Sequence, residues 1–228
     1  MKKIIAMLLT VVLLMTCCSA LAAGKISVVQ ENFHVISGYW TYGYAYAKVE
    51  NVGDKPIKVN AGVLELYDAE GEVITSTDYL DAYATYLQPG EYTYVEMYDD
   101  TEEGDPIPED YMLTLTGKSD STATVRLPVE TKLELGVEDG WWTYDYMYAT
   151  VTNNTEETLY DLEVVLALLD AEGNILYIAS HYLYSDVGVN PGATLTFRKD
   201  IESSFMEYFT AKGIVPTAVD AIAYVIVD

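Results

Sequence analysis

The chain has little cysteine or histidine, and each shortage excludes a class of chemistry. Both cysteines, Cys17 and Cys18, lie in the N-terminal segment, so we expect no disulfide, thiolate or zinc–cysteine site in the remainder. The only histidines, His34 and His181, stand in no catalytic motif, and no nucleophile elbow or phosphate-binding glycine loop is present. Acidic residues are too abundant for one glycosidase-like carboxylate pair to stand out. We predict that the protein is not an enzyme and has no cofactor.

Basic side chains are also scarce. The chain has 12 Lys and Arg residues against 36 Asp and Glu residues, a formal net charge of −24. Such a surface repels phosphate backbones and anionic membranes, so we predict no nucleic-acid partner. A simpler role for this charge is solubility, because acidic surfaces keep exported proteins dispersed in water.

The N-terminal segment has the pattern of a secretory signal peptide. Two lysines precede an apolar run over residues 4–15, and small residues then allow cleavage after Ala22. We therefore predict a signal peptide over residues 1–22 and a secreted or otherwise extracytoplasmic protein. The apolar run is short for a membrane span and no second run follows, so the mature chain has no predicted transmembrane segment. Two alternatives stay open: a membrane anchor, and a lipoprotein acylated at Cys17 or Cys18.

The rest of the chain repeats itself at a constant offset of 102 residues. A repeat of this length is a whole domain, because solenoid units recur about every 20 to 50 residues. The matching segments are 38–47 with 140–149, 64–71 with 166–173, and 89–90 with 191–192. We predict two domains, one over residues 25–128 and one over residues 129–228.

Each repeat carries the signals of short strands, in which Tyr, Val, Thr, Ile and Leu alternate with small or polar residues. Residues 68–71 predict a tight hairpin connection in which Gly71 takes a positive φ. The Pro-Gly pairs predict turns that open a further strand. One exception, residues 204–212 before Gly213, predicts a short helix. These patterns favour an all-β chain of two tandem β-sandwiches.

One motif points to a known family. The segment Leu64-Glu65-Leu66-Tyr67-Asp68 resembles the signature of the FxLYD domain, with Leu in place of Phe. Residues 47–51 and the pair Pro89-Gly90 lie where that family has its small-x-Val-x-Asn and Pro-Gly elements. The second copy departs from the motif at Leu169, where the family has Tyr. The resemblance implies two tandem immunoglobulin-like β-sandwiches of a bacterial exported protein, and it brings no catalytic residues.

The most unusual feature is aromatic. Aromatic residues recur at every second position of two predicted strands, and residues two apart in a strand project from one face. Val49 has the other parity, and the resemblance implies that it is a core residue, so the aromatic side chains project from the face opposite the core. We expect two neighbouring strands to form this first aromatic face. Its residues are Trp40, Tyr42, Tyr44, Tyr46, Tyr92, Tyr94 and Tyr98. The second copy keeps one strand of it, the second aromatic row, and has Thr194 and Thr196 in place of Tyr92 and Tyr94, with Arg198 further along the same strand. The second aromatic row consists of Trp142, Tyr144, Tyr146 and Tyr148.

Two interpretations of the first aromatic face compete. It is either buried by the other domain or a linker, or it is an exposed platform that suits sugar rings or a protein partner. On the second interpretation the protein is a non-enzymatic extracytoplasmic binding or adhesion module for a glycan or protein of the cell envelope. The alternative is a structural spacer or accessory subunit of an envelope complex that binds no small ligand. Exposed tyrosines would favour the platform, and buried tyrosines the spacer.

A second oddity is the acidic stretch over residues 99–110. Asp99, Glu103 and Asp110 fall near the spacing of a calcium-binding loop, so calcium is a weak prediction. Pro106 and Pro108 stiffen the segment, and the second copy lacks it. A solvated loop is the simpler interpretation.

Overall fold

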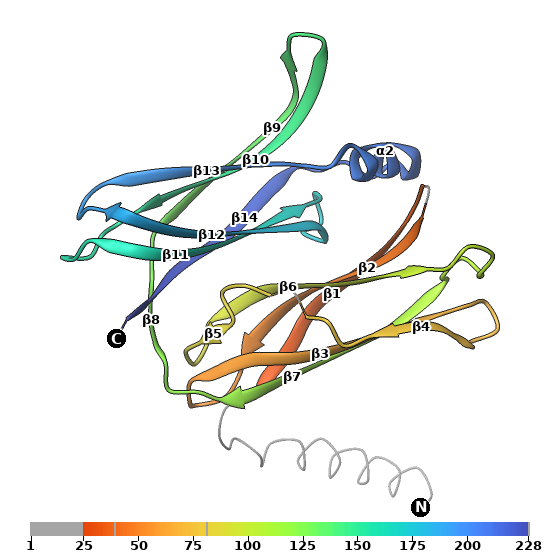
Figure 1. The fold of residues 1–228 in the computed structure, drawn as a ribbon, viewed down its shortest axis with the longest axis horizontal. Coiled ribbons are helices and arrows are strands. Elements are labelled where there is room, and N and C mark those ends of the chain that lie inside the picture. Colours follow the sequence, from red (N-terminus) through yellow and green to blue (C-terminus); the bar gives the residue numbers. More distant parts are fainter. Residues whose placement is uncertain (1–24, 39, 81, 228) are drawn as a thin grey trace, which may run out of the picture.

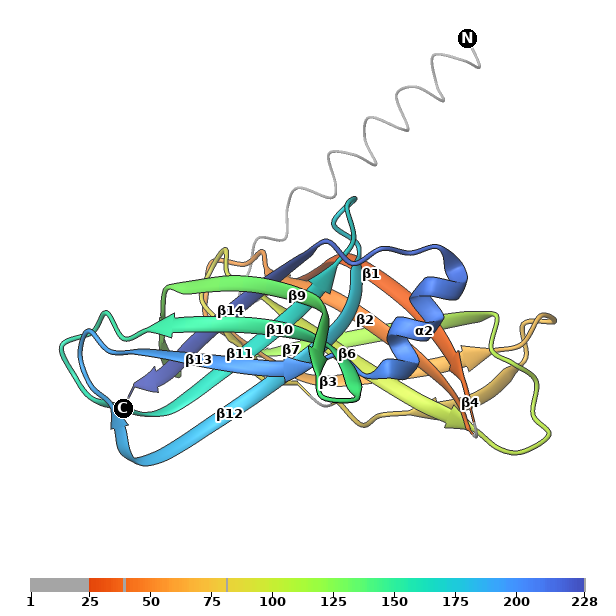
Figure 2. The same ribbon diagram turned by 90° about the horizontal axis from the view of Figure 1, so that it is seen from above.

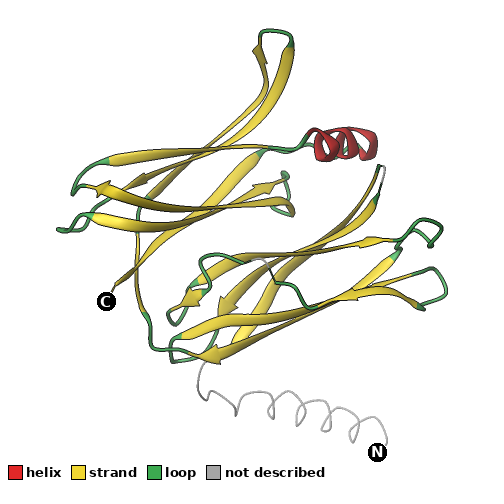
Figure 3. Ribbon diagram, in the orientation of Figure 1, coloured by secondary structure: helices red, strands yellow, loops and turns green. Residues whose placement is uncertain are grey.

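The computed structural model of the protein describes residues 25–38, 40–80 and 82–227. The predicted signal peptide and the two cysteines lie outside the described residues. Within them 65% of the chain is β-strand and one short helix is present, which confirms the predicted all-β class (Figure 3).

The first half of the chain, residues 25–119, forms two antiparallel sheets. Its strands are β1 (Ile26–Ser37), β2 (Thr41–Asn51), β3 (Ile57–Tyr67), β4 (Val73–Thr77), β5 (Tyr86–Leu87), β6 (Tyr92–Thr101) and β7 (Asp110–Ser119). One sheet has the order β1-β2-β6, and in the other β3 pairs with β4, β5 and β7. Strand β1 therefore lies at the edge of its sheet.

The second half, residues 123–227, also forms two antiparallel sheets. Its elements are β8 (Ala123–Arg126), β9 (Val129–Asp139), β10 (Trp142–Thr152), β11 (Leu159–Leu169), β12 (Ile175–Val189), β13 (Thr194–Asp200), α2 (Ser203–Lys212) and β14 (Ala218–Val227). The sheet orders are β13-β10-β9 and β12-β11-β14-β8. Because β8 pairs with β14, the chain enters the second half before the predicted boundary at 128 and 129.

The four sheets stack as layers (Figure 1). The β13-β10-β9 sheet is outermost, the β12-β11-β14-β8 sheet follows, and the latter lies against the β1-β2-β6 sheet of the first half. Seen from above, β9, β10 and β13 lie over the other strands (Figure 2). One cluster of buried residues runs from the interior of the second half into the junction between the halves, where it includes Tyr46 and Tyr94.

This layering explains why equivalent strands of the two repeats differ in sequence. In β3 the exposed Val63 and half-buried Glu65 alternate with the buried Leu64 and Leu66. In β11 the five residues 164–168 are all buried, because both faces of their sheet are covered. A continuous apolar run is what such a strand requires.

The predicted core face of β2 and β10 is confirmed. Val49 is 0% exposed and Val151 is 2% exposed. Gly43 lies on the same face, where an added Cβ would stand 2.7 Å from a methyl carbon of Leu66. The aromatic side chains therefore project from the opposite face, as the alternation predicts.

The asparagine of the small-x-Val-x-Asn element has a structural role. The Nδ2 of Asn51 donates to the carbonyl oxygens of Lys55 and Leu87 at 2.9 and 3.0 Å. Its Oδ1 accepts from the Gly53 N–H at 3.0 Å. Asn153 makes the equivalent three hydrogen bonds in the second half. Each asparagine is buried with its polar atoms satisfied, and it ties two loops to the end of a strand.

The predicted turn and helix are also confirmed. Gly71 has a φ of 81° in the hairpin between β3 and β4, and the Asp68 carboxylate accepts backbone N–H bonds within that turn. Helix α2 ends at Gly213, which has a φ of 70°. No helix in the described part of the chain is long and apolar enough to cross a membrane.

Candidate functional site

The first aromatic face is assembled as predicted. Strands β2 and β6 pair, and Tyr44 lies directly opposite Tyr98. Lys48 and Glu50 continue the same face of β2 and lie opposite Tyr94 and Tyr92. The prediction that these two strands are neighbours is therefore confirmed.

The prediction that this face is an exposed platform is wrong for most of its area. Tyr46 is 0% exposed and Tyr94 is 2% exposed. Tyr44 packs edge-on against Phe205 of α2, with ring centroids 4.8 Å apart. The face is covered because the second half packs on it, which is the alternative that the sequence left open. The part of the face around Trp40 and Tyr98 stays accessible, where these side chains are 46% and 39% exposed.

Polar contacts between the halves reinforce this packing. The hydroxyls of Tyr92 and Tyr94 both donate to Oδ2 of Asp220, at 2.9 and 2.6 Å. Burial, together with the bond to Asp220, raises the pKa of Tyr92 to about 12. The Glu163 carboxylate accepts the backbone N–H of Ala84 at 2.6 Å. These bonds satisfy polar groups that the packing removes from water.

His34 belongs to the same junction and is not placed as a catalytic base. It is 4% exposed, and its ring lies 5.5 Å from the rings of Tyr208 and Phe209. Burial lowers its pKa to about 4, against smaller raising effects from the Ile175 carbonyl and the charge of Asp170. His34 is therefore neutral at physiological pH.

One buried group in the junction is unsatisfied. Among the described residues the Tyr46 hydroxyl has no hydrogen-bond partner. We expect Tyr46→Phe to raise the free energy of unfolding by about 1 kcal/mol, because it removes a desolvated hydroxyl and keeps the ring. Urea denaturation measures this change. Tyr94→Phe is the matched control and should have the opposite sign, since it removes the bond to Asp220; equal effects of the two changes would contradict the assignment.

The second aromatic row has a different environment. Trp142, Tyr144, Tyr146 and Tyr148 lie on β10, which belongs to the outermost sheet (Figure 2). They alternate with the buried residues Met147, Ala149 and Val151, so they project from the opposite face of the strand. Trp142 is 70% exposed, Tyr144 and Tyr148 are half-buried, and Tyr146 is 5% exposed because the Arg198 guanidinium and the neighbouring rings cover it. The ring of Tyr146 lies 5.8 Å from that of Tyr144 and 6.0 Å from that of Tyr148. The rings cover one another, and within the described residues no further sheet lies over them.

Charged side chains of both signs flank the second aromatic row. Lys132 and Arg198 lie on either side of Tyr148, and Glu134 and Asp200 lie on either side of Tyr146. Lys132 pairs with Glu134, and the guanidinium of Arg198 lies 4.5 Å from the Tyr146 ring. Although the protein is strongly acidic, the centre of this face is nearly balanced in charge.

Sequence reasoning did not single out Trp141. The hairpin formed by β9 and β10 projects beyond the body of the second half, and Trp141 is in its turn (Figure 1). Trp141 is 97% exposed. The signal that could have identified it is the sequence Gly-Trp-Trp between two strand patterns, which indicates a turn. Gly140 provides the positive φ of that turn, 65°. A large apolar side chain at a hairpin tip gains nothing from the fold.

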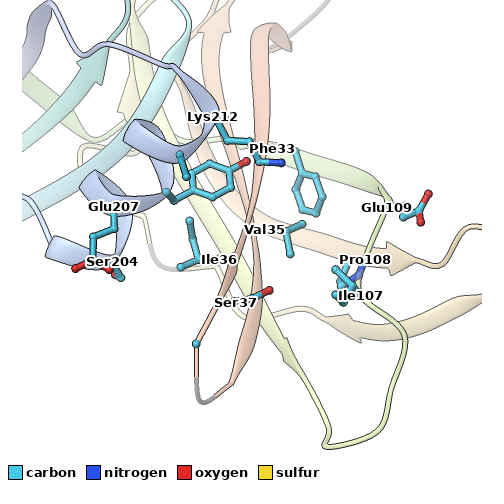
Figure 4. A pocket seen from close by; sticks show the side chains of 13 residues that line it. Phe33, Val35, Ile36, Ser37, Ile107, Pro108, Glu109, Ser204, Glu207 and Lys212 are labelled. Carbon is cyan, nitrogen blue, oxygen red and sulfur yellow. The ribbon is translucent and has the colours of Figure 1, made fainter.

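A groove lies where the two halves meet beside β1 (Figure 4). The C-terminal part of β1 runs between α2 and the loop that carries Ile107, Pro108 and Glu109. The groove has a volume of about 710 Å³. Phe33, Val35, Ile36 and Tyr208 add apolar surface to it, and Ser204, Glu207 and Lys212 of α2 lie along one side.

The structure does not bring the predicted calcium ligands together. The Asp99 carboxylate accepts the hydroxyl of Thr75 at 2.7 Å, and that of Asp110 accepts the N–H of Tyr111 at 2.8 Å. Glu103 lies in the turn between β6 and β7. Within residues 25–38, 40–80 and 82–227, no three His, Cys, Asp or Glu side chains are grouped closely enough to hold a metal ion.

Comparison with known proteins adds no assignment to this geometry. No protein family model matches the chain, and no curated protein is similar to it.

Proposed function

We propose that the protein is a non-enzymatic, extracytoplasmic binding module that takes neutral carbohydrate on the second aromatic row. One observation carries the proposal: the second half packs on the aromatic row of the first repeat, whereas the row of the second repeat lies on an outer sheet face, where Trp142 is 70% exposed. The extracytoplasmic location is inferred from the signal-peptide pattern over residues 1–22. The resemblance of residues 64–68 to the FxLYD signature suits an exported protein and leaves function open.

The chemistry of the face favours a neutral glycan. Aligned tyrosine and tryptophan rings offer flat apolar surfaces against which sugar rings stack, while their polar atoms stay in water. Lys132, Glu134, Arg198 and Asp200 supply donors and acceptors for hydroxyl groups. Their balanced charges attract no ion of either sign strongly. An anionic polymer would also be repelled by the net charge of −24.

A matched set of variants tests this function. We expect the labelled protein to bind neutral oligosaccharides on a glycan array, and the double variant Trp142→Ala/Tyr144→Ala to bind at least about tenfold more weakly. The thermal transition should stay nearly unchanged, because these side chains do not enter the core. Trp40→Ala, an exchange of an accessible tryptophan on the first aromatic face, is the control and should bind like the wild type. The proposal is ruled out if the wild type binds no neutral glycan, or if the double variant binds as strongly as the wild type.

A second candidate is the spacer or accessory subunit of an envelope complex. The buried cluster shared between the halves favours it, because it holds them in one relative orientation, as a rigid spacer requires. This candidate predicts no glycan on the array. It also predicts that exchange of Trp141 and Trp142 for Ser leaves assembly with envelope proteins intact.

A further inference from the structure

We propose that the second aromatic row takes the end of a neutral glycan chain, which lies along β10 with its terminal sugar against Trp142. This inference rests on the proposed carbohydrate binding, and it specifies which part of a glycan the site selects. Three features of the outer sheet support it: a bend at one end of the row, charged side chains along both of its sides, and a guanidinium held at its centre.

The bend is built by a β-bulge. The register of β9 and β10 shifts between Tyr144 and Tyr146, so that residues 135 and 136 of β9 lie opposite Asp145 alone. Gly136 takes a φ of 67°, and its N–H donates to Oδ1 of Asp145 at 2.8 Å. A bulge bends the strand, and the hairpin turns away from the layers beneath it (Figure 1). The sheet therefore bends toward its outer face, and Trp142, which projects from that face, stands at the end of the row.

The two ends of the row differ for this reason. Beyond Tyr148 the same face continues into Thr150 and Thr196, whose hydroxyls form an exposed hydrogen bond of 2.9 Å. A glycan chain can leave the face in this direction. At the other end the hairpin stands in its path, and Trp142, with 70% of its surface exposed, offers a ring against which a terminal sugar stacks.

Charged side chains set the direction of the chain. Lys132 and Glu134 of β9 lie along one side of the row, and Arg198 and Asp200 of β13 lie along the other. A chain that crossed the strands would have to pass over both pairs. A chain along β10 keeps its rings over aromatic side chains and its hydroxyl groups beside charged donors and acceptors.

The centre of the row is a hydrogen-bond donor. The Arg198 guanidinium lies 4.5 Å from the Tyr146 ring, and its Nε lies 4.0 Å from Oδ1 of Asp200. These two contacts hold the guanidinium in place, while the Arg198 side chain stays 57% exposed and keeps N–H groups for ligand hydroxyls. Tyr144 and Tyr148 on either side of it are separated by about 14 Å of strand. A monosaccharide cannot contact both rings, so affinity should rise with chain length.

Calorimetric titration with chains of different length tests the inference. The probes are linear hexasaccharides of glucose, mannose, galactose and xylose, each beside the soluble polysaccharide of the same sugar and linkage at equal sugar concentration. We expect at least one hexasaccharide to bind, and to bind at least about tenfold better than its polysaccharide. The reason is that the polysaccharide has far fewer chain ends per sugar.

Two alanine variants test the direction of the bound chain. Trp142→Ala should weaken binding of the hexasaccharide and of the corresponding disaccharide, each by at least about tenfold, because both place their terminal sugar there. Tyr148→Ala should weaken the hexasaccharide by at least about threefold and leave the disaccharide unchanged. Arg198→Gln should also weaken the hexasaccharide. Lys212→Gln, which removes a basic side chain near the Tyr208 ring on α2, is the control and should bind like the wild type.

The outcomes separate this inference from the proposed function. The inference is overturned, while carbohydrate binding stands, if a polysaccharide binds as well as its hexasaccharide. The same holds if Tyr148→Ala weakens the disaccharide as much as Trp142→Ala does. If the wild type binds none of these glycans, the inference and the proposed function both fail. Circular dichroism and thermal melts confirm that the variants are folded.

Discussion

Tyr46→Ala should lower the free energy of unfolding by about 3–5 kcal/mol, whereas Tyr148→Ala should lower it by less than about 1 kcal/mol. The two residues occupy equivalent positions in the repeat. Tyr46 is 0% exposed in the junction between the halves, and its loss leaves a cavity that the packed layers on either side do not fill. Tyr148 lies on the outer sheet face, where water replaces its ring at little cost.

Equilibrium denaturation in urea, followed by tryptophan fluorescence and by circular dichroism, measures both changes. Because the junction cluster includes residues of both halves, we expect one shared transition in the wild type. In Tyr46→Ala the unfolding midpoints measured by fluorescence and by circular dichroism should separate, because the two halves are coupled less strongly. Similar destabilisation by both alanine variants would show that the second aromatic row is also buried, and the proposed carbohydrate site would then be lost.

Acidification should destabilise the protein through His34. The pKa of this residue is lowered by burial from 6.5 to about 4, so the folded state disfavours the protonated imidazole relative to the unfolded state. The stability contributed by neutral His34 is fully present above pH 6.5 and is lost as the pH falls toward about 4. A shift of this size corresponds to about 3 kcal/mol.

The measurement is the free energy of unfolding between about pH 7 and pH 4, for the wild type and for His34→Gln. Carboxylates titrate in the same range, so the test lies in the difference between the two proteins. We expect a distinctly shallower loss of stability in His34→Gln. His181→Gln is the control: burial also lowers the pKa of His181, but this side chain lies within the second half beside Phe197. Parallel curves for the wild type and His34→Gln would refute the role of His34.

The two repeats illustrate how one pattern serves two environments. Where the first repeat has Tyr92 and Tyr94 on β6, the second has Thr194 and Thr196 on β13. Tyr92 and Tyr94 fill the junction, where their hydroxyls reach Asp220, whereas the threonines lie on the outer sheet. Likewise Glu65 of β3 corresponds to Ala167 of β11, which is buried between two layers. These substitutions were visible in the sequence, and in retrospect they indicate which copy of the aromatic face is covered.

The sequence by itself determined the local structure of the protein. Alternation assigned Val49 and Val151 to the core and the aromatic residues to the opposite face, and glycine positions located the turn at Gly71 and the end of α2. These features depend on residues close in the chain, because the period of a strand and the sterics of a turn are local properties.

Only the tertiary structure decided which aromatic surface meets solvent, and that β1, α2 and the loop over residues 102–109 form one groove. Both outcomes depend on how the two halves pack, which joins residues more than a hundred positions apart, such as Tyr94 and Asp220. Strand periodicity specifies that a face is apolar, but burial of that face depends on the shape and polarity of a distant partner surface. The two aromatic faces therefore had the same local signal and acquired different environments.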